Sequence, residues 1–154
     1  MIKMNKKGVT LIELIVVMVI IAIGATLMVP GIGRWLPNYR LRSATRDIVS
    51  TMRTAQMKAI SQNLQYRVSF NTADTGKLNN NYYILQHNTG GNWISDGVVN
   101  SLPTGITIVS NDLQDKRAVF NSNSTTSAGT ITLTNTKSQK SIVLSAASGR
   151  VRIP

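Results

Sequence analysis

Residues 6–29 read KKGVTLIELIVVMVIIAIGATLMV, and this stretch decides the architecture of the N-terminal part of the chain. Residues 9–29 are 21 positions interrupted by one charge, Glu13. At ~1.5 Å per residue they form a helix of about 32 Å, which matches a hydrocarbon core of about 30 Å. The preceding segment, MIKMNKKG, is basic and contains no acid, so it is expected to stay cytoplasmic. The sequence therefore predicts a single-pass membrane helix with the rest of the chain exported.

The junction between the basic segment and the apolar run predicts a processing site. An ordinary secretory signal has an apolar core of roughly 7–15 residues followed by a cleavage site of small residues. Here the apolar run is longer and lacks an Ala-x-Ala step, so the natural cut lies before it, between Gly8 and Val9. Residues 1–8 then form a leader peptide, and the hydrophobic helix stays on the mature protein.

Glu13 is the one ionisable residue of the apolar run. A charge within such a helix costs roughly 2.5–3.5 kcal/mol and usually marks a function with a specific partner. Cleavage would give Val9 a positive amine one helical turn away, and Glu13 can neutralise that amine or the amine of a neighbouring subunit. Such a pair sets the register of packed helices while aliphatic side chains supply adhesion. The alternative is that Glu13 reaches the lipid headgroups and has no partner.

Residues 6–13, KKGVTLIE, resemble the prepilin processing site of type IV pilins and type II secretion pseudopilins. The resemblance implies that a membrane aspartyl peptidase, prepilin peptidase, cuts after Gly8 and that Val9 is then N-methylated. It also implies that Glu13, the fifth residue of the mature chain, acts in subunit assembly. The family usually has phenylalanine at the first mature position, where this chain has Val9.

A second helical segment follows the apolar run. Pro30 and Pro37 are expected to break or loosen the helix. Apolar residues then recur at three- and four-residue steps, which indicates an amphipathic helix over residues 38–62 that packs on a sheet. The stripe consists of Leu41, Ala44, Ile48, Met52, Ala55 and Ala59. The charged residues that fall largely away from it are Arg40, Arg46, Asp47 and Arg53.

The rest of the chain, residues 64–154, has the composition of a β-rich domain. Short runs of alternating apolar residues, bounded by turn residues, predict six or seven antiparallel strands with one buried face. Residues 88–92, NTGGN, predict a turn after a strand at 82–87, and residues 121–128, NSNSTTSA, predict a mobile polar loop. Tyr82 and Tyr83 point to opposite faces of their strand, which favours core packing over a base-stacking platform. The fold class is therefore α+β.

Composition narrows the function. The chain has 17 Lys and Arg against 6 Asp and Glu, and trimming after Gly8 leaves 14 against 6, a net charge of +8. This excess favours anionic partners, although it can equally serve solubility. There is no cysteine and only one histidine, His87, which we interpret as a strand residue rather than a ligand or base. No carboxylate pair, catalytic triad or ligand cluster stands out among the 6 acids and one histidine, so we expect no cofactor and no enzymatic activity. Major pseudopilins carry an acidic calcium loop near the C-terminus, but no acid follows Asp115 here, so the resemblance implies no such metal site.

The C-terminal residues Gly149-Arg150-Val151-Arg152 suggest an anion site. Arg150 and Arg152 alternate along a strand and project on the same side, with Val151 and Ile153 towards the core. Such a pair can hold adjacent phosphates without reading bases. The alternative is a solvated edge strand whose arginines discourage aggregation.

This Gly-Arg-Val-Arg run, with residues 55–60, AQMKAI, resembles the H-type pseudopilin and FimT-like minor pilin group. In FimT-like members the C-terminal Gly-Arg-x-Arg is associated with DNA binding during uptake, which implies Gly149, Arg150 and Arg152 as candidate DNA-binding residues. The resemblance also implies a long N-terminal helix packed on an antiparallel sheet.

We therefore predict a minor pilin or minor pseudopilin of a type IV pilus or type II secretion filament. Its expected parts are a leader (1–8), a transmembrane and assembly helix (9–30), an amphipathic half (31–63) and an exported head (64–154). The expected location is the inner membrane with a periplasmic head, and then the filament. Expected partners are other pilin or pseudopilin subunits and prepilin peptidase, with DNA and secreted cargo as further candidates. The alternative function is a membrane-anchored DNA-binding minor pilin.

Overall fold

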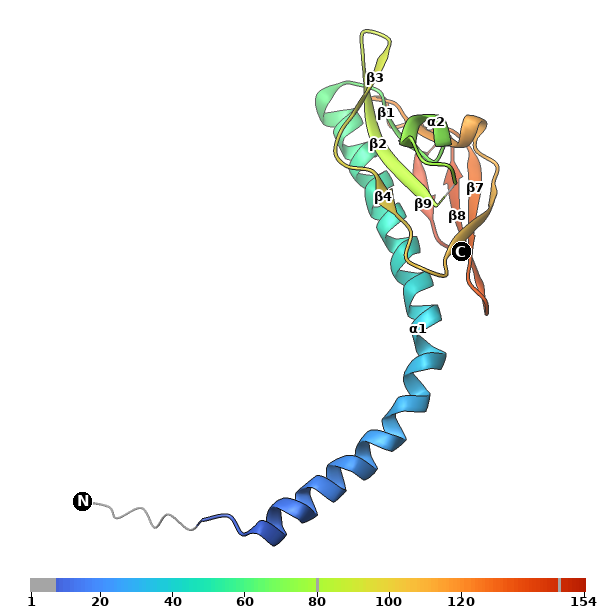
Figure 1. Ribbon diagram of the computed structural model, residues 1–154. Helices are drawn as coiled ribbons and strands as arrows, with labels where there is room; N and C mark the ends of the chain where they lie inside the picture. The colour runs from blue at the N-terminus through green and yellow to red at the C-terminus, as the bar shows by residue number, and fades with distance from the viewer. Residues whose placement is uncertain (1–7, 80, 147) are drawn as a thin grey trace, which may run out of the picture. The chain divides into compact units, whose positions relative to one another are not determined.

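The computed structural model describes residues 8–79, 81–146 and 148–154. The chain divides into two compact units, residues 1–36 and 37–154. One long helix, α1 (Leu11–Gln62), contributes residues to both units, and every strand belongs to the second (Figure 1). Two single-turn helices, α2 (Thr72–Thr75) and η1 (Gln114–Lys116), lie among the strands. The second unit is thus a helix combined with antiparallel sheets, which confirms the predicted α+β class.

The predicted break in the first helix is wrong, because α1 runs for 52 residues through both Pro30 and Pro37. Proline lacks the N–H donor of one helical hydrogen bond and disfavours the preceding turn, at about 3 kcal/mol in a helix interior. Its fixed φ of about −65° is nevertheless helical, so each proline removes a bond without ending the helix. The helix ends instead after Gln62, where Asn63 adopts a left-handed φ of 53° and Leu64 N donates to Ala59 O at 3.2 Å.

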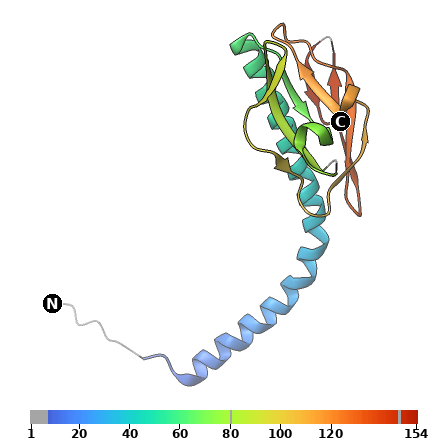
Figure 2. The same ribbon diagram turned by 45° about the horizontal axis from the view of Figure 1, so that its top comes forward.

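The predicted apolar stripe of the second helical segment is confirmed. All six of its residues are at most 1% exposed, and the four charged residues placed outside it are exposed. Three of the six are alanines, whose small side chains let strands lie close to the helix. The strands lie along this part of α1 in both ribbon views (Figure 2).

The first sheet has five strands, in the order β3–β2–β1–β6, with β4 paired to the same edge of β2 as β3. Its strands are β1 (Tyr66–Ser69), β2 (Tyr82–Thr89), β3 (Asn92–Ser95), β4 (Asn100–Ser101) and β6 (Arg117–Phe120). Gly90 and Gly91, with φ of 60° and 88°, form the β2–β3 turn, as the sequence predicts. Tyr83 packs on Phe70 with ring centroids 5.8 Å apart, which confirms its assignment to the core.

The second sheet has four antiparallel strands in the order β5–β7–β8–β9. They are β5 (Thr107–Asn111), β7 (Gly129–Thr134), β8 (Gln139–Ser145) and β9 (Arg150–Arg152). The described residues therefore form nine strands instead of the predicted six or seven. The two-residue strand β4 is too short for apolar and polar residues to alternate along it, so no pattern could reveal it. At the far end of the β7–β8 hairpin, Asn135 Nδ2 donates to Pro37 O of α1 at 2.8 Å.

The segment predicted as a mobile polar loop, residues 121–128, is exposed at residues 122–124 and 128 and is joined to the sheets through Thr126. Thr126 is buried and forms a β-bridge with Phe120, and its N–H donates to Ala146 O at 3.2 Å. Asn121 N donates to Thr125 O at 2.9 Å and closes a tight turn. The polar composition of this segment therefore satisfies its own backbone, because these side chains and main-chain groups replace water as hydrogen-bond partners.

Candidate functional site

The residues around the predicted cleavage junction precede and begin α1. Gly8, Val9 and Thr10 lie before the helix and are exposed, while residues 1–7 of the predicted leader lie outside the described residues. Thr10 caps the helix: its Oγ1 accepts from Glu13 N at 3.3 Å, and its carbonyl accepts from Leu14 N at 3.3 Å. A Thr-x-x-Glu run is a common capping arrangement, and an acid in the first turn is favoured by the helix dipole. Thr10 thus caps the helix through the backbone N–H of Glu13, and the Glu13 carboxylate lies in the first turn, where the helix dipole favours an acid.

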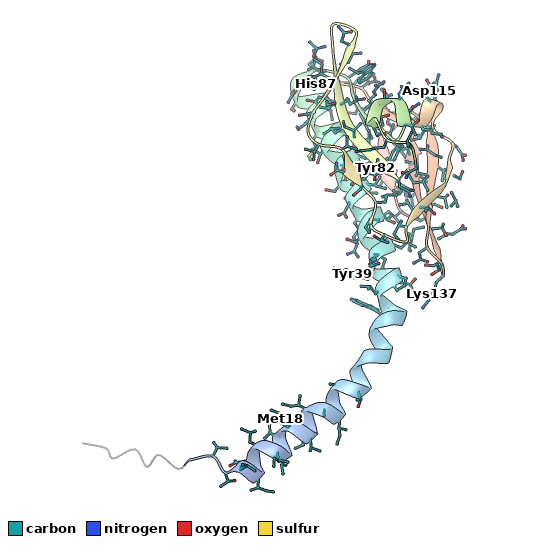
Figure 3. The ribbon with its side chains drawn as sticks, viewed as in Figure 1. Met18, Tyr39, Tyr82, His87, Asp115 and Lys137 are labelled. Atoms are coloured by element: carbon teal, nitrogen blue, oxygen red, sulfur yellow. The ribbon has the colours of Figure 1, made fainter. Side chains whose placement is uncertain are left out.

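The first part of α1 exposes large apolar side chains over its whole circumference. Met18, labelled in Figure 3, is 65% exposed, and its neighbours along the helix are similarly bare. The exposed apolar residues are Val9, Leu11, Ile12, Leu14, Ile15, Val16, Val17, Met18, Val19, Ile20, Ile21 and Ile23. Exposed apolar surface of this extent indicates contact with other chains or with lipid. Within the described residues, none of the helices meets the combined requirement of length and apolarity for crossing a membrane.

The predicted C-terminal anion site lies on β9, the edge strand of the second sheet. Arg150 and Arg152 are exposed and Val151 between them is 8% exposed, so the two arginines share one side as predicted. Ile153 does not face the core: it follows the end of β9 and is 41% exposed. β9 is held by pairing with β8, where Val151 lies opposite Leu144.

Gly149 has a packing role that the sequence does not reveal. Its φ is 59°, a left-handed conformation that favours glycine. A Cβ at this position would overlap Ser124 O and lie 2.6 Å from Gln56 Nε2 of α1. Gly149 therefore lets β9 start directly against both the helix and the turn around Ser124. No ligand is needed to explain why glycine stands here.

A groove lies between β9 and α1. It has a volume of about 650 Å³ and joins the two arginines of β9 to a third, Arg53 of the helix. Its lining residues are Arg53, Gln56, Met57, Arg150, Val151, Arg152 and Ile153. The predicted arginine pair is thus part of a basic groove whose other wall is α1, a contribution that the sequence analysis missed. The spacing of Arg53 shows only that it points away from the buried stripe, not that β9 lies beside it.

A second basic groove of about 280 Å³ adjoins the first, because Ile153 lines both. Its other lining residues are Arg42, Thr45 and Arg46 of α1 and Lys140 of β8. Neither groove is lined by an acid or by an aromatic residue. The two grooves therefore form one continuous basic surface along α1 and the edge of the second sheet.

Three of the acids are already neutralised elsewhere. Asp74 is held by Arg117, with Nε at 2.7 Å, and by Arg67, with Nη2 at 3.1 Å. Burial by itself raises the pKa of Asp74, but hydrogen bonds from Arg117 and Ser69 and the charge of Arg67 outweigh it, so the pKa is lowered.

A second acid is neutralised by the helix. Asp96 accepts from Lys58 Nζ at 2.8 Å, and this hydrogen bond lowers the pKa of Asp96 and raises that of Lys58. The third, Asp115, lies 3.5 Å from Arg117 Nη1, and its position on the surface is labelled in Figure 3. None of these pairs lies in the two basic grooves.

A buried polar cluster that no sequence pattern indicates lies on the first sheet. Arg67 of β1 donates from Nε to Gln86 Oε1 at 2.8 Å, and its guanidinium lies 4.1 Å from the ring centroid of Trp93. Arg67, Gln86, Trp93 and Asp74 together cover the outer face of β1. A strand with one buried face would expose this outer face to solvent, as the sequence analysis predicted. Since Arg67 Nε and Nη2 and both carboxylate oxygens of Asp74 are engaged within the fold, we assign this cluster to stability rather than to binding.

The one histidine of the sequence, His87, lies on the first sheet. His87 lies half-buried on β2 with its ring centroid 5.6 Å from that of Tyr66, and its Nδ1 has no hydrogen-bond partner in the described part of the chain. Among residues 8–79, 81–146 and 148–154, no three His, Cys, Asp or Glu side chains are grouped so that they could hold a metal ion.

Comparison with protein families gives two matches. A model of the prokaryotic N-terminal methylation motif matches residues 3–29, and a model described as type II transport protein GspH matches residues 44–149. The first match covers the predicted cleavage junction and the exposed apolar helix, and the second covers most of the helix-and-sheet unit. No curated protein matches the chain.

Solved structures share the fold at low sequence identity. The minor pseudopilin EpsH from the type 2 secretion system of Vibrio cholerae aligns with a TM-score of 0.60 at 12% identity, over 75% of this chain and 96% of that one. The type IV minor pilin FimU of Pseudomonas aeruginosa aligns with a TM-score of 0.58 at 12% identity, over 76% and 90%. At such identity the likeness concerns the fold alone.

Proposed function

The chain belongs to the GspH family of type II transport proteins, which are pilin-like filament subunits, and we propose that it is cut between Gly8 and Val9, methylated at Val9 and assembled through its N-terminal helix. The observation that carries this proposal is the match of the methylation motif to residues 3–29, within which the apolar side chains between Val9 and Ile23 are exposed. A surface of this kind needs a cover, and neighbouring helices of a filament supply one. In this role the chain is a minor pilin or minor pseudopilin rather than an enzyme.

Before assembly, residues 9–29 are proposed to lie in the lipid bilayer. The basic residues Lys3, Lys6 and Lys7 precede the apolar run, which favours a cytoplasmic leader and a periplasmic head in the inner membrane. Residues 31–63 then belong to the periplasmic part, and residues 64–154 form the β-rich head.

Glu13 is the proposed assembly residue. Within the described residues its carboxylate forms no ion pair, and it lies in the first turn of α1, close in sequence to the amine that cleavage creates on Val9. Once water is excluded between packed helices, an unpaired carboxylate is costly, so a pair with an amine is favoured over an isolated charge. The pair forms only when the subunit reaches one axial position, and it therefore sets the register.

The proposal is tested in the filament-forming host by mass spectrometry of the incorporated chain and by two substitutions. We expect an N-methylated Val9 terminus in the filament, and at least a tenfold loss of incorporation for Glu13→Ala and Glu13→Gln. Asp47→Asn, which neutralises an exposed acid of α1 outside the apolar run, is the matched control and should assemble normally. Recovery of an intact Met1 terminus from filaments would refute processing, and normal incorporation of both Glu13 variants would refute the pairing.

A second candidate function, DNA binding, is favoured by the groove between β9 and α1. We propose that Arg150 and Arg152, held by Gly149 beside Arg53, bind phosphates of DNA. The test is binding of the full chain, in micelles of a neutral detergent, to a 30-base-pair duplex. Arg150→Ala with Arg152→Ala should weaken binding at least tenfold, and unchanged affinity would remove the basis of this candidate.

A further inference from the structure

We infer that the nucleic-acid surface extends beyond β9 into a basic strip along α1 and β8, which holds one duplex through its phosphates without reading its bases. The basic strip consists of Arg42, Arg46, Arg53, Lys140, Arg150 and Arg152. This inference rests on the DNA-binding function proposed above and adds three cations, Arg42, Arg46 and Lys140, which the C-terminal run does not contain.

The strip is continuous because its two grooves share one residue. Ile153 lines both the groove of β9 and the groove of Lys140, so the cations of the two grooves follow one another along the same side of the second unit. On α1, Arg42, Arg46 and Arg53 recur at intervals of four and seven residues, which places them on one face of the helix. From Arg42 to Arg53 the helix rises about 16 Å, which is the span of about five phosphates of one DNA strand.

The cations of the strip are available to a ligand. Within the described part of the chain none of the six forms an ion pair, and five of them are exposed, with Lys140 half-buried. The acids that could screen them lie elsewhere: Asp47 lies beside Tyr83 of β2, and Asp112 accepts from Ser110 Oγ at 3.0 Å at the end of β5. The other acids of the second unit, Asp74, Asp96 and Asp115, form ion pairs within the chain. The second unit of another copy of this chain therefore has no acidic face that would match the strip. The complement is therefore a different, anionic molecule.

The cations of the strip are expected to contribute more to binding a nucleic acid than to binding an acidic protein. An exposed ion pair between two proteins contributes only about 0–1 kcal/mol, so the five exposed arginines and the half-buried Lys140 would add little to such an interface. Each cation that neutralises a DNA phosphate instead releases a condensed counterion, and the contributions accumulate along the strand. The strip, with exposed cations and no acid in its lining, is the arrangement that gains most from a regular polyanion.

The lining also predicts how the nucleic acid is bound. Neither groove contains an aromatic side chain, so unpaired bases find no ring on which to stack. Contacts made by arginine and lysine to phosphates fix position without carrying sequence information. Binding is therefore expected to be independent of sequence and no tighter for single strands than for duplex of the same phosphate count.

The experiment measures the salt dependence of duplex binding by the full chain in neutral detergent micelles, with three variants. The strip variant carries Arg42→Ala, Arg46→Ala and Lys140→Ala. The β9 variant carries Arg150→Ala and Arg152→Ala. The control variant carries Arg40→Ala, Lys77→Ala and Lys116→Ala, which remove the same three charges from exposed positions outside both grooves. Near-UV circular dichroism confirms that each variant is folded.

With six phosphate contacts, log Kd should rise with log salt concentration with a slope of about 5, which is a loss of affinity of roughly 10³ between 50 and 200 mM salt. The strip variant should lower the slope to about 3, while the control variant keeps the parent value. An unchanged slope for the strip variant, together with weakened binding by the β9 variant, overturns this inference and leaves the DNA-binding function standing. Failure of the parent chain to bind duplex overturns both, and displacement of duplex by polyglutamate at equal charge concentration assigns the strip to an acidic protein instead.

Discussion

Replacing Gly149 by alanine should destabilise the second unit more than the backbone conformation alone explains. A non-glycine residue with a left-handed φ costs about 1–2 kcal/mol. The added Cβ would also overlap Ser124 O, which belongs to a turn closed by the Asn121–Thr125 hydrogen bond and cannot withdraw freely. Gln56 can rotate its side chain away, but the carbonyl can move only with its turn. Overpacking of this kind costs about 1–3 kcal/mol, so Gly149→Ala should lose about 2–5 kcal/mol in total.

Gly90→Ala is the matched control for this experiment. Gly90 has nearly the same φ, 60° against 59° for Gly149, but a Cβ built on it meets nothing within 4 Å. Gly90→Ala therefore reports the conformational cost alone, and the difference between the variants reports the clash. Thermal unfolding of the full chain in detergent, followed by near-UV circular dichroism, should place the Tm of Gly149→Ala roughly 4–12 °C below that of Gly90→Ala.

Equal Tm values for the two alanine variants, within about 2 °C, would refute the argument, because the close approach of β9 to the turn and helix would then carry no energetic consequence. The same variants separate packing from ligand binding. If Gly149 acts only through packing, duplex affinity measured well below the Tm of Gly149→Ala should change no more than about twofold.

Asp74→Asn should cost about 2–4 kcal/mol at pH 7, because it leaves Arg67 buried without its full partner. Since the pKa of Asp74 is lowered by folding, its contribution is fully present above pH ~4 and is lost as the pH falls towards that lowered pKa; unfolding at stepped pH should show this decline in the parent and a flatter profile in the variant. Ala55→Leu, at a fully buried position of α1, should lose about 1–3 kcal/mol in denaturant unfolding, whereas exposed Met57→Leu should change stability by less than about 0.5 kcal/mol. Lys58→Ala should cost less than about 1 kcal/mol by the same assay, because its pair with an aspartate is partly open to water.

The helical stripe was predictable because its period is a local property of the sequence. Leu41 and Met52 belong to a pattern whose angular spacing places them on one face wherever the helix packs. The helix breaks expected at Pro30 and Pro37 are absent, because proline has two opposing effects on a helix. Proline disfavours a helix through its missing donor but favours it through φ, and the sequence does not show which part prevails.

The buried polar cluster was not predictable because it is assembled from distant segments. Arg67 reads as the polar member of an alternating strand, yet it is buried under Trp93 and Asp74. Asp74 is 43 residues from its other partner, Arg117, and no local pattern relates the two. The rule of one buried face fails at β1 because other segments cover its second face.

Only part of the candidate binding surface was predictable from the sequence. Arg150 and Arg152 share a face of any strand, so their pairing follows from alternation alone. The contributions of Arg53 and Lys140 depend on how α1 and β8 pack around β9, which only the tertiary structure reveals. The role of Gly149 is hidden for the same reason, since its neighbours Gln56 and Ser124 come from other parts of the chain.

The exposed β2–β3 turn makes this chain suitable for fluorescence imaging of filaments on living cells. The sequence contains no cysteine, so one introduced thiol is the sole target for a maleimide dye. Thr89, the exposed last residue of β2, adjoins a glycine pair around which a Cβ meets no atom within 4 Å. A dye on Thr89→Cys would be carried by the first sheet, while the basic strip lies along the helix and the second sheet. The proposed filament assembly and the proposed nucleic-acid binding could then be followed on the same labelled molecule.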